Sequence, residues 1–428
     1  MNKLHTWLKS LIKRSGFKIE WISLLKSSSW SLKKGKIVHK SGQFFKIIGV
    51  RFRDPQGILS DQPFIDQREI GTLGFLIREI KQEKEILVQA KIEPGNSHII
   101  QLAPTCQATK SNSLRVHGGK EPPFSHLFTK EHPQVIGSTL QSEQGSRFFK
   151  KQNLNILALN NQELNIPESH QWIPVDTILN LLSEDYLVNT DARSVLVCSP
   201  WKELVNRTPF SKFKTTFANE LKQSYNQEIK TGQFEKMKKS LSSFQQSKNS
   251  VEIIPLNQLI NWKISDFGIE PIQKKPFQIK YLKVDTKSRE VFEWDQPIIE
   301  SYGQGQVDLI CGRISGELFF NFKIIVEPGL HNHAELSPTI CVEPGENKST
   351  KFFIDYPRAK ILKTVLQSDE GGRFYRDITK YRLIDIGEAD LSLPGYWLNL
   401  AQIQSLLLKN GWFTNEARSA LSLILFWL

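Results

Sequence analysis

LQSEQGSRFF at residues 140–149 returns as LQSDEGGRFY at residues 366–375, with six of ten positions identical. A longer pair of segments repeats in the same order. Residues 61–105 and 295–339 align without a gap and share 13 of 45 residues. Self-similar segments in a constant order indicate a tandem repeat. The sequence therefore predicts two homologous domains.

Each copy begins with strand-like segments and ends with helical ones, which favours an α+β domain that is used twice. FFKIIGVRF, GTLGFLIREI and EILVQAKIE are the strand-like segments of the first copy, and TILNLLSEDY begins its helical part. Phe213, Phe217, Leu221 and Tyr225 have helical spacing between the copies. We predict a basic amphipathic leader at 1–29, a first repeat at 30–205, a helical linker at 206–250 and a second repeat at 251–428. A partly disordered connector is the alternative for the linker.

Composition excludes several classes of protein. Of the 428 residues, 39% are hydrophobic, which is too many for a disordered or fibrous chain. Four cysteines without a C-x-x-C spacing disfavour a disulfide scaffold or a zinc ribbon and suggest a reducing compartment. No apolar run reaches the roughly 18 residues of a membrane span. We therefore predict a cytoplasmic protein without a membrane segment.

The whole net charge of +12 lies in residues 1–53, which hold 13 basic residues and the single acid Glu20. A DNA-binding domain usually spreads its positive charge over a folded face with a reading element. We interpret the basic leader as a solvated outer face. An anionic partner is the alternative, but nucleic acid is an unlikely one on this pattern.

The repeated turn is the candidate binding motif, because its glycine, amide and guanidinium groups could bind a diphosphate. Arg147 and Arg373 occupy the same position in the two copies. The alternative is a structural turn in which each arginine binds a carboxylate. The predicted substrate-binding residues are Gln141, Ser142, Glu143, Gln144, Gly145, Arg147, Trp294, Gly371, Gly372, Arg373 and Arg376.

Positions at which the two copies differ are candidates for separating a working site from a vestigial one. Trp294 could stack on a base or sugar ring, whereas its counterpart is Ser60. Glu370 aligns with Gln144. Glu335 likewise faces an amide in the first copy. Because general acid–base catalysis needs ionisable groups, we nominate Glu370 and Glu335 as the catalytic residues. Surface drift is the alternative for each of these differences.

Four segments together resemble the NDP-hexose 2,3-dehydratase family: QAKIEPGNSHIIQLAPTCQATKSN, LQSEQGSRFFKK, VEPGLHNHAELSPTICVEPGE and LQSDEGGRFYRD. The resemblance extends from about Trp30 to the C-terminus. It implies a homodimer in which each subunit consists of two Nudix-like domains that have lost their metal-binding box. It also implies catalysis without a metal or an organic cofactor.

The implied substrate is dTDP-4-dehydro-6-deoxyglucose. Its C4 ketone acidifies the C3 proton, so that a base can remove this proton and the C2 hydroxyl can leave. The product is a 3,4-diketo-2,6-dideoxy sugar nucleotide. Within this resemblance, Arg147 and Arg373 would bind the diphosphate and Trp294 would stack on the thymine. A nucleotide-sugar binding module that has lost its chemistry is the main alternative, and a nucleic-acid-associated protein is a weaker one. The apolar end SLILFWL is expected to be buried at a subunit contact.

Overall fold

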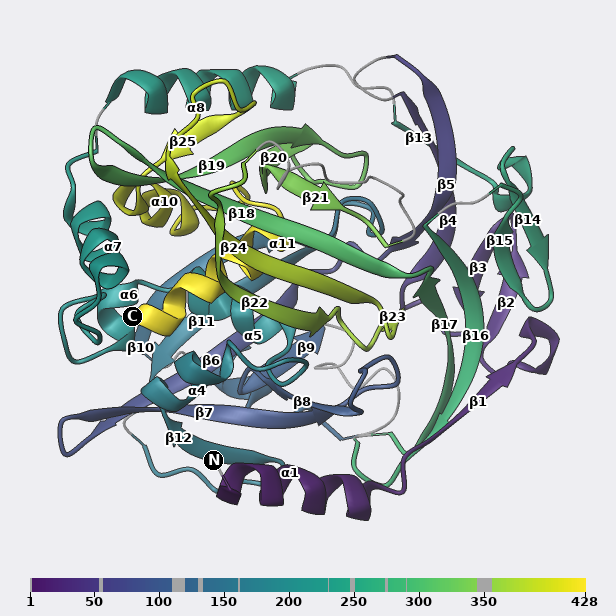
Figure 1. The fold of residues 1–428 in the computed structure, drawn as a ribbon. Helices are drawn as coiled ribbons and strands as arrows, with labels where there is room; N and C mark the ends of the chain where they lie inside the picture. The colour runs from purple at the N-terminus through teal and green to yellow at the C-terminus, as the bar shows by residue number, and fades with distance from the viewer. Residues whose placement is uncertain are drawn as a thin grey trace.

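The computed structural model describes residues 2–53, 57–109, 120–129, 134–160, 162–229, 231–246, 251–273, 276–289, 291–344 and 356–428. The fold is mixed α+β and contains two large and two small β-sheets. Figure 1 shows the large sheets in one lobe and the small sheets in the other. The predicted strand and helix segments of both repeats are present, so the α+β class is confirmed.

The first large sheet belongs entirely to the first half of the chain. Its strands are β6 (Gly71–Ile80), β7 (Glu83–Ile92), β8 (Ile100–Ala103), β9 (Cys106–Thr109), β10 (Gln134–Ser142), β11 (Gln152–Leu159) and β12 (His170–Pro174). The strand order is β10-β11-β6-β7-β12, with β8 on β7 and β9 on β6. Strands β11 and β6 are parallel, whereas the other pairs are antiparallel.

The second large sheet belongs to the second half and repeats this order. Its strands are β18 (Gln304–Ile314), β19 (Glu317–Val326), β20 (Ala334–Pro338), β21 (Ile340–Val342), β22 (Lys360–Ser368), β24 (Ile378–Glu388) and β25 (Tyr396–Leu398). Here the order is β22-β24-β18-β19, with β20 and β25 on β19 and β21 on β18. Strands β24 and β18 are the parallel pair. The two large sheets therefore share one topology.

The two small sheets exchange a strand between the halves. One contains β2 (Trp30–Lys33), β3 (Lys36–His39), β4 (Lys46–Arg53), β5 (Leu59–Asp66) and β13 (Val251–Ile254). The other contains β1 (Lys18–Ile22), β14 (Trp262–Ser265), β15 (Gly268–Pro271), β16 (Phe277–Asp285), β17 (Glu293–Ser301) and β23 (Phe374–Tyr375). Strand β13 of the second half pairs with β4, and β1 of the first half pairs with β16. Each half thus completes the small sheet of the other.

The repeated Asp-Gln-Pro motif fixes this exchange. The indole N–H of Trp30 donates to the backbone oxygen of Asp295 at 2.7 Å, and that of Trp262 donates to the backbone oxygen of Asp61 at 3.0 Å. The carboxylate of each aspartate also accepts a backbone N–H from the opposite half, at 2.7 and 2.9 Å. Because these groups are buried, each bond satisfies a donor that would otherwise lose its partner.

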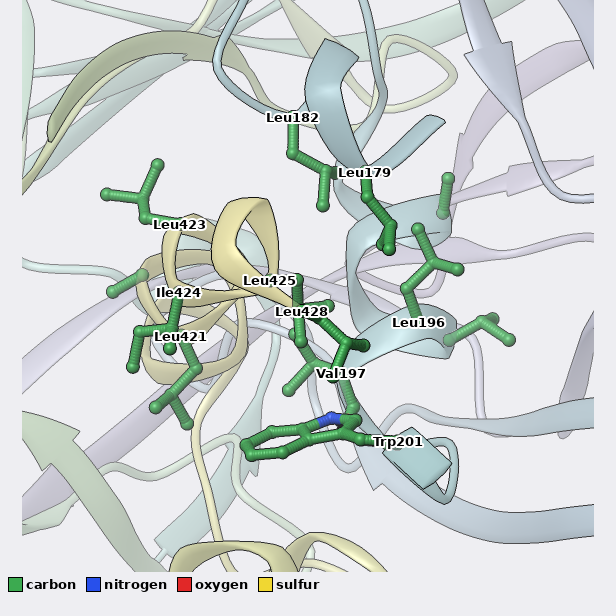
Figure 2. Packing of buried hydrophobic residues seen from close by; sticks show 14 of the residues in the cluster. Leu179, Leu182, Leu196, Val197, Trp201, Leu421, Leu423, Ile424, Leu425 and Leu428 are labelled. Atoms are coloured by element: carbon green, nitrogen blue, oxygen red, sulfur yellow. Dashed lines mark hydrogen bonds between the residues drawn. The ribbon is translucent and has the colours of Figure 1, made fainter. Parts of the chain in front are cut away.

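Helices from both halves fill the space between the large sheets. The described helical elements are α1 (Asn2–Ser15), η1 (Leu24–Lys26), α3 (Ser125–Thr129), α4 (Val175–Leu181), α5 (Thr190–Val197), α6 (Trp201–Leu204), α7 (Thr216–Asn226), α8 (Thr231–Gln246), η2 (Leu256–Gln258), α10 (Leu400–Leu407), α11 (Asn415–Leu421) and η3 (Ser422–Trp427). Side chains of α4, α5 and α6 pack against those of α11 and η3 (Figure 2). The core therefore continues from one half into the other.

The apolar C-terminal segment lies inside this shared core. Leu423, Ile424, Leu425 and Leu428 are fully buried in the single chain. Burial of the segment was expected, but the expected location at a subunit contact was wrong. The partner surface is the first half of the same chain, because α4, α5 and α6 supply a matching apolar face.

The basic leader and the predicted linker both form packed helices. Helix α1 buries Leu4 and Leu8, and α8 buries Phe234 and Met237 in the same core. Figure 1 shows α1 beside β12 at one end of the large-sheet lobe and α8 beside β25 at the other. Helices α7 and α8 lie within the predicted linker, and the domain limits, those of the linker included, remain predictions. Among the described helices, none is long and apolar enough to cross a membrane.

Candidate active site

The two predicted turns meet two other repeated turns in a crossed arrangement. Gly329, in the Glu-Pro-Gly turn of the second half, donates its N–H to the oxygen of Gly145 at 2.9 Å. Gly95, in the equivalent turn of the first half, donates to the oxygen of Gly371 at 2.8 Å. A Cβ atom on Gly95 would lie 1.5 Å from the backbone oxygen of Phe374, so only glycine fits there. The repeated motifs thus form the contact between the halves.

The glutamine of each Asp-Gln-Pro motif holds the turn of its own half. Gln62 donates its amide N–H to the oxygen of Ser146 at 2.6 Å, and Gln296 donates to the oxygen of Gly372 at 2.7 Å. Two aligned arginines, Arg193 of the first half and Arg418 of the second, then cross between the large sheets. Arg418 donates from Nε to the hydroxyl of Ser194 at 2.8 Å and from Nη2 to the oxygen of Ser142 at 2.5 Å. These bonds hold the turns against the helical core.

Charged side chains around the crossed turns fall into two neighbouring groups, whose members act most strongly on one another's pKa. The groups adjoin, because Glu416 acts on Glu143 and Glu143 acts on Asp369. The first charged group consists of Lys91, Glu93, Glu143, Lys151, Asp191, Glu370 and Arg373. The second charged group consists of Arg147, Glu327, Glu335, Glu343, Asp369, Asp377 and Glu416. The first group contains three cations and the second contains one. The first group therefore offers a diphosphate more cations than the second, beside four carboxylates of its own.

Glu143 is a buried carboxylate of the first group, with 6% of its surface exposed. Its two oxygens accept hydrogen bonds from the amides of Asn153 and Asn415, the latter at 3.1 Å. Burial and the negative charge of Glu370 raise the pKa of Glu143 to about 7, against lowering contributions from Arg418 and Lys151. Glu143 is therefore poised to hold a proton near neutral pH.

Glu370 is partly exposed, and it comes from the turn of the second half. Burial raises the pKa of its carboxyl, whereas Arg373, Lys91 and Lys151 lower it. Glu143 and Glu370 thus form a pair of carboxylates that differ in solvent access and in their nearest cations. Such a pair has the properties of an acid–base couple.

Two cations of the first group are held by oxygen atoms of the first half. Lys91 Nζ lies 3.2 Å from Glu93, and Lys151 Nζ donates to the backbone oxygen of Glu69 at 2.6 Å. Burial lowers the pKa of Lys151, while the charges of Glu143 and Glu370 raise it. A buried ammonium beside paired carboxylates can stabilise an oxyanion that develops on a bound substrate.

The two predicted arginines have different environments. Arg147 is 4% exposed, lies 4.1 Å from the ring centroid of Phe277 and donates to Glu343 at 2.7 Å. Arg373 lies 4.2 Å from the ring centroid of Phe45 and is partly exposed. Its Nη atoms donate to Gly372 and Gln67, and its buried Nε has no partner among the described residues. Arg373 is thus available to a ligand, whereas Arg147 already binds a carboxylate.

The second charged group is dominated by carboxylates. Burial raises the pKa values of Glu327 and Asp369 well above their ordinary values, and neighbouring acids add to the effect. Asp377 binds the hydroxyl of Ser301, and burial raises its pKa too. Asp377 follows its turn where Lys151 follows the equivalent turn of the first half. This exchange of charge makes the second group unfavourable for a polyanion.

The structure places the remaining predicted residues as follows. Glu335 is 1% exposed and accepts a hydrogen bond from the hydroxyl of Ser142 at 2.6 Å, and burial raises its pKa to about 7. Its charge acts on Glu327, so it lies with the second group and not beside Glu370. Gln141 donates to the oxygen of Lys409 at 3.0 Å, and the buried Gln144 interacts with Asp369.

Trp294 lies at the edge of the first group. Its indole N–H donates to Gln296 at 2.9 Å, and the guanidinium of Arg289 lies 5.8 Å from its ring centroid. Arg289 in turn lies 3.9 Å from Glu93. Arg376 is exposed beside Tyr375, with 5.3 Å between the guanidinium and the ring centroid. Gln296 accepts the indole N–H of Trp294 and donates to Gly372 of the second turn. The structure therefore brings Trp294 into the same region as Glu370.

Four members of the first group were not predicted as site residues: Lys91, Glu93, Lys151 and Asp191. Asp191 is 4% exposed in α5, whose N-cap Asn189 accepts the N–H of Ala192 at 2.8 Å. These positions lie next to repeated motifs, and a search for changes of charge between the copies would have found Lys151. Across the described ranges, no cluster of three or more histidine, cysteine, aspartate or glutamate side chains could hold a metal ion.

Comparisons with known proteins identify the family of this chain. The family model for NDP-hexose 2,3-dehydratase matches residues 1–199 and 236–424. A dTDP-4-dehydro-6-deoxy-alpha-D-glucopyranose 2,3-dehydratase of Saccharopolyspora spinosa is 30% identical over 97% of this chain and 90% of its own length. Proteins of the same name from Amycolatopsis orientalis and Streptomyces violaceoruber are 31% and 32% identical, over 98% and 86% of this chain and 89% and 84% of their own lengths. The chain belongs to the NDP-hexose 2,3-dehydratase family of hydro-lyases.

Proposed function

We propose that the chain removes water across C2 and C3 of dTDP-4-dehydro-6-deoxy-D-glucose, and that the reaction takes place at the first charged group. The relatives are named for this substrate. The observation that carries the choice of site is the pair Glu143 and Glu370 beside three cations. We also propose that the two halves are duplicated Nudix-like domains, which their shared strand order supports.

In the proposed reaction, Glu370 is the base and Glu143 is the acid. The C4 ketone acidifies the proton on C3, and the partly exposed Glu370 carboxylate takes this proton. The electron pair moves to the ketone oxygen as an enolate. The enolate then re-forms its carbonyl as the C2–O bond breaks, and the hydroxyl leaves as water with the proton of Glu143. Tautomerisation of the resulting enol gives the 3,4-diketo-2,6-dideoxy sugar.

The remaining groups bind charge. Arg373 presents an unsatisfied Nε and a planar guanidinium, which suits two oxygens of the diphosphate. Lys151 lies in the electrostatic field of both carboxylates, where its ammonium would stabilise the enolate oxygen. Trp294 would stack on a ring at the edge of the site. A homodimer and a cytoplasmic location remain predictions.

The direct test is turnover of the 4-keto-6-deoxy sugar nucleotide by the purified chain in the presence of EDTA. A 3-ketoreductase and NADPH trap the diketo product, so NADPH consumption reports dehydration. We expect turnover that needs no added metal or cofactor. Binding of the sugar nucleotide without turnover would support the binding-module alternative instead. Absence of both would refute the proposed substrate.

A further inference from the structure

A cavity of about 190 Å³ lies between the N-terminal helix and the first large sheet. Leu11 of α1 forms one wall. The other walls are formed by the end of β7 and by Lys120, Glu121, Pro123, Ser169, Ser288 and Arg289. The helix is fastened at both ends of this wall. Trp7 donates its indole N–H to the oxygen of Glu168 at 2.9 Å, and the oxygen of Ser15 accepts the N–H of Lys287 at 2.7 Å.

The cavity adjoins the first charged group. Lys91 and Arg289 both line it, and both pair with Glu93, at 3.2 and 3.9 Å. Arg289 also donates to the backbone oxygen of Ile92 at 2.8 Å and lies near Trp294. A ligand that occupies the cavity would therefore reach the cations of the reaction centre without crossing another element.

The lining matches the chemistry of a pyrimidine nucleoside. Leu11, Ile92 and Pro123 supply apolar surface for a flat ring. Gln89 supplies an amide, whose donor and acceptor complement the imide edge of thymine or uracil. The volume is below the roughly 300–1,000 Å³ of pockets that enclose a whole drug-sized ligand. The cavity is thus suited to one end of a larger molecule.

The equivalent positions of the second half have lost this chemistry. The alignment of the two halves replaces Lys91 by Ile325 and Gln89 by Lys323. Ile325 cannot bind a phosphate, and the Lys323 ammonium has donors but no acceptor for an imide edge. The equivalent of Lys91 in the second half is thus uncharged. The second charged group likewise has fewer cations than the first.

We infer that this cavity binds the pyrimidine nucleoside of the sugar nucleotide, with the N-terminal helix as its wall and Lys91 and Arg289 facing the diphosphate. The inference rests on the proposed function, because it assumes a substrate that carries a nucleoside diphosphate. It gives the basic leader a defined role: its amphipathic helix closes the nucleoside site of the same chain.

The test is a tryptophan that fills the cavity, Leu11→Trp, with Lys9→Trp on the exposed face of the same helix as the matched control. Calorimetry measures the Kd of dTDP, and inorganic pyrophosphate is titrated as its competitor. We expect Leu11→Trp to weaken dTDP by at least about tenfold, which corresponds to about 1.4 kcal/mol, and to leave the pyrophosphate constant within about twofold. Lys9→Trp should change neither.

Unchanged dTDP affinity in Leu11→Trp, or an equal loss for dTDP and pyrophosphate, would overturn the inference. Gln89→Leu is the second variant if Leu11→Trp does not fold, and the same two outcomes decide. These titrations need no turnover. If the wild type binds dTDP but does not dehydrate the sugar nucleotide, the proposed reaction fails while the nucleoside site stands. If it turns over normally and Leu11→Trp binds dTDP like the wild type, only the nucleoside site fails.

Discussion

Replacement of Glu143 by glutamine should stabilise the protein at alkaline pH and abolish its chemistry. The pKa of this carboxyl is about 7 in the folded chain against an ordinary 4.5. Each pH unit between two such values corresponds to about 1.4 kcal/mol, so full ionisation of Glu143 costs the folded state about 3.5 kcal/mol at most. Glutamine has the shape of the protonated acid and cannot ionise. Its NH2 cannot accept the second of the two N–H bonds to Glu143, so the gain requires the amide of Asn153 or Asn415 to turn its oxygen toward it.

The sign follows from the raised pKa. The folded state binds the Glu143 proton more tightly than the unfolded state, so this contribution to stability is complete below pH 4.5. It is lost as the pH rises through 7. The free energy of unfolding of Glu143→Gln should therefore approach the wild-type value near pH 5 and exceed it by about 1–3 kcal/mol at pH 8.5.

Urea denaturation at several pH values measures the stability, and the NADPH-coupled assay measures turnover. Loss of a proton-transfer group should lower kcat by about 10²–10⁴-fold. Glu335→Gln is the informative comparison, because burial raises the pKa of Glu335 to about 7 as well. We expect a similar gain of stability at alkaline pH but a smaller loss of turnover.

Two results would refute this reasoning. If the stability of Glu143→Gln depends on pH as that of the wild type does, the carboxyl does not carry a raised pKa. If Glu335→Gln loses turnover and Glu143→Gln retains it, the sequence-based pair Glu370 and Glu335 is the acid–base pair.

The other predictions concern binding and the contact between the halves. Arg373→Lys should weaken sugar-nucleotide binding by about 1.5–3 kcal/mol in calorimetry. Arg147→Lys should leave binding intact and lower the stability in urea, because the ion pair of Arg147 is internal. Equal effects of the two variants on binding would contradict this assignment. Asp295→Ala and Asp61→Ala should each cost about 1–3 kcal/mol in urea denaturation, because each leaves a backbone N–H without its acceptor; wild-type midpoints would show that water replaces the carboxylate. Gly95→Ala should prevent folding or sharply lower the Tm, because its Cβ has no room; a wild-type Tm would show that the turns can separate.

The repeat in the sequence predicted the class of fold and the existence of a second copy. It did not predict whether a turn of one half contacts its own half or the other half. An alignment of Gly95 with Gly329 is the same whether each turn packs within its own half or against the other half. In the structure, Gly95 binds Gly371 and Gly329 binds Gly145. The exchange of β1 and β13 could not be predicted for the same reason. A strand that pairs with the other half has the same pattern of side chains as one that pairs within its own half.

The site was predicted only in part for a related reason. Identities between the copies identified both turns, yet they made Arg147 and Arg373 look equivalent. Their partners, Glu343 and Gln67, lie outside the repeated turn, so the turn alone could not distinguish them. Lys151 escaped notice because identity was the criterion, whereas the informative property of this position was a reversal of charge.

The crossed turns also explain why a duplicated chain could keep one reaction centre and lose the symmetry of the other. The first charged group takes Lys91, Lys151 and Glu143 from the first half, but Glu370 and Arg373 from the second. Neither half alone contains this set. A change in one copy of the turn therefore acts on the centre of the other half, so the two centres could diverge in charge while the backbone bonds between the turns remained the same. On this view the two halves remain alike where glycines and buried backbone groups allow no other residue. They differ where only the charge of a side chain changes.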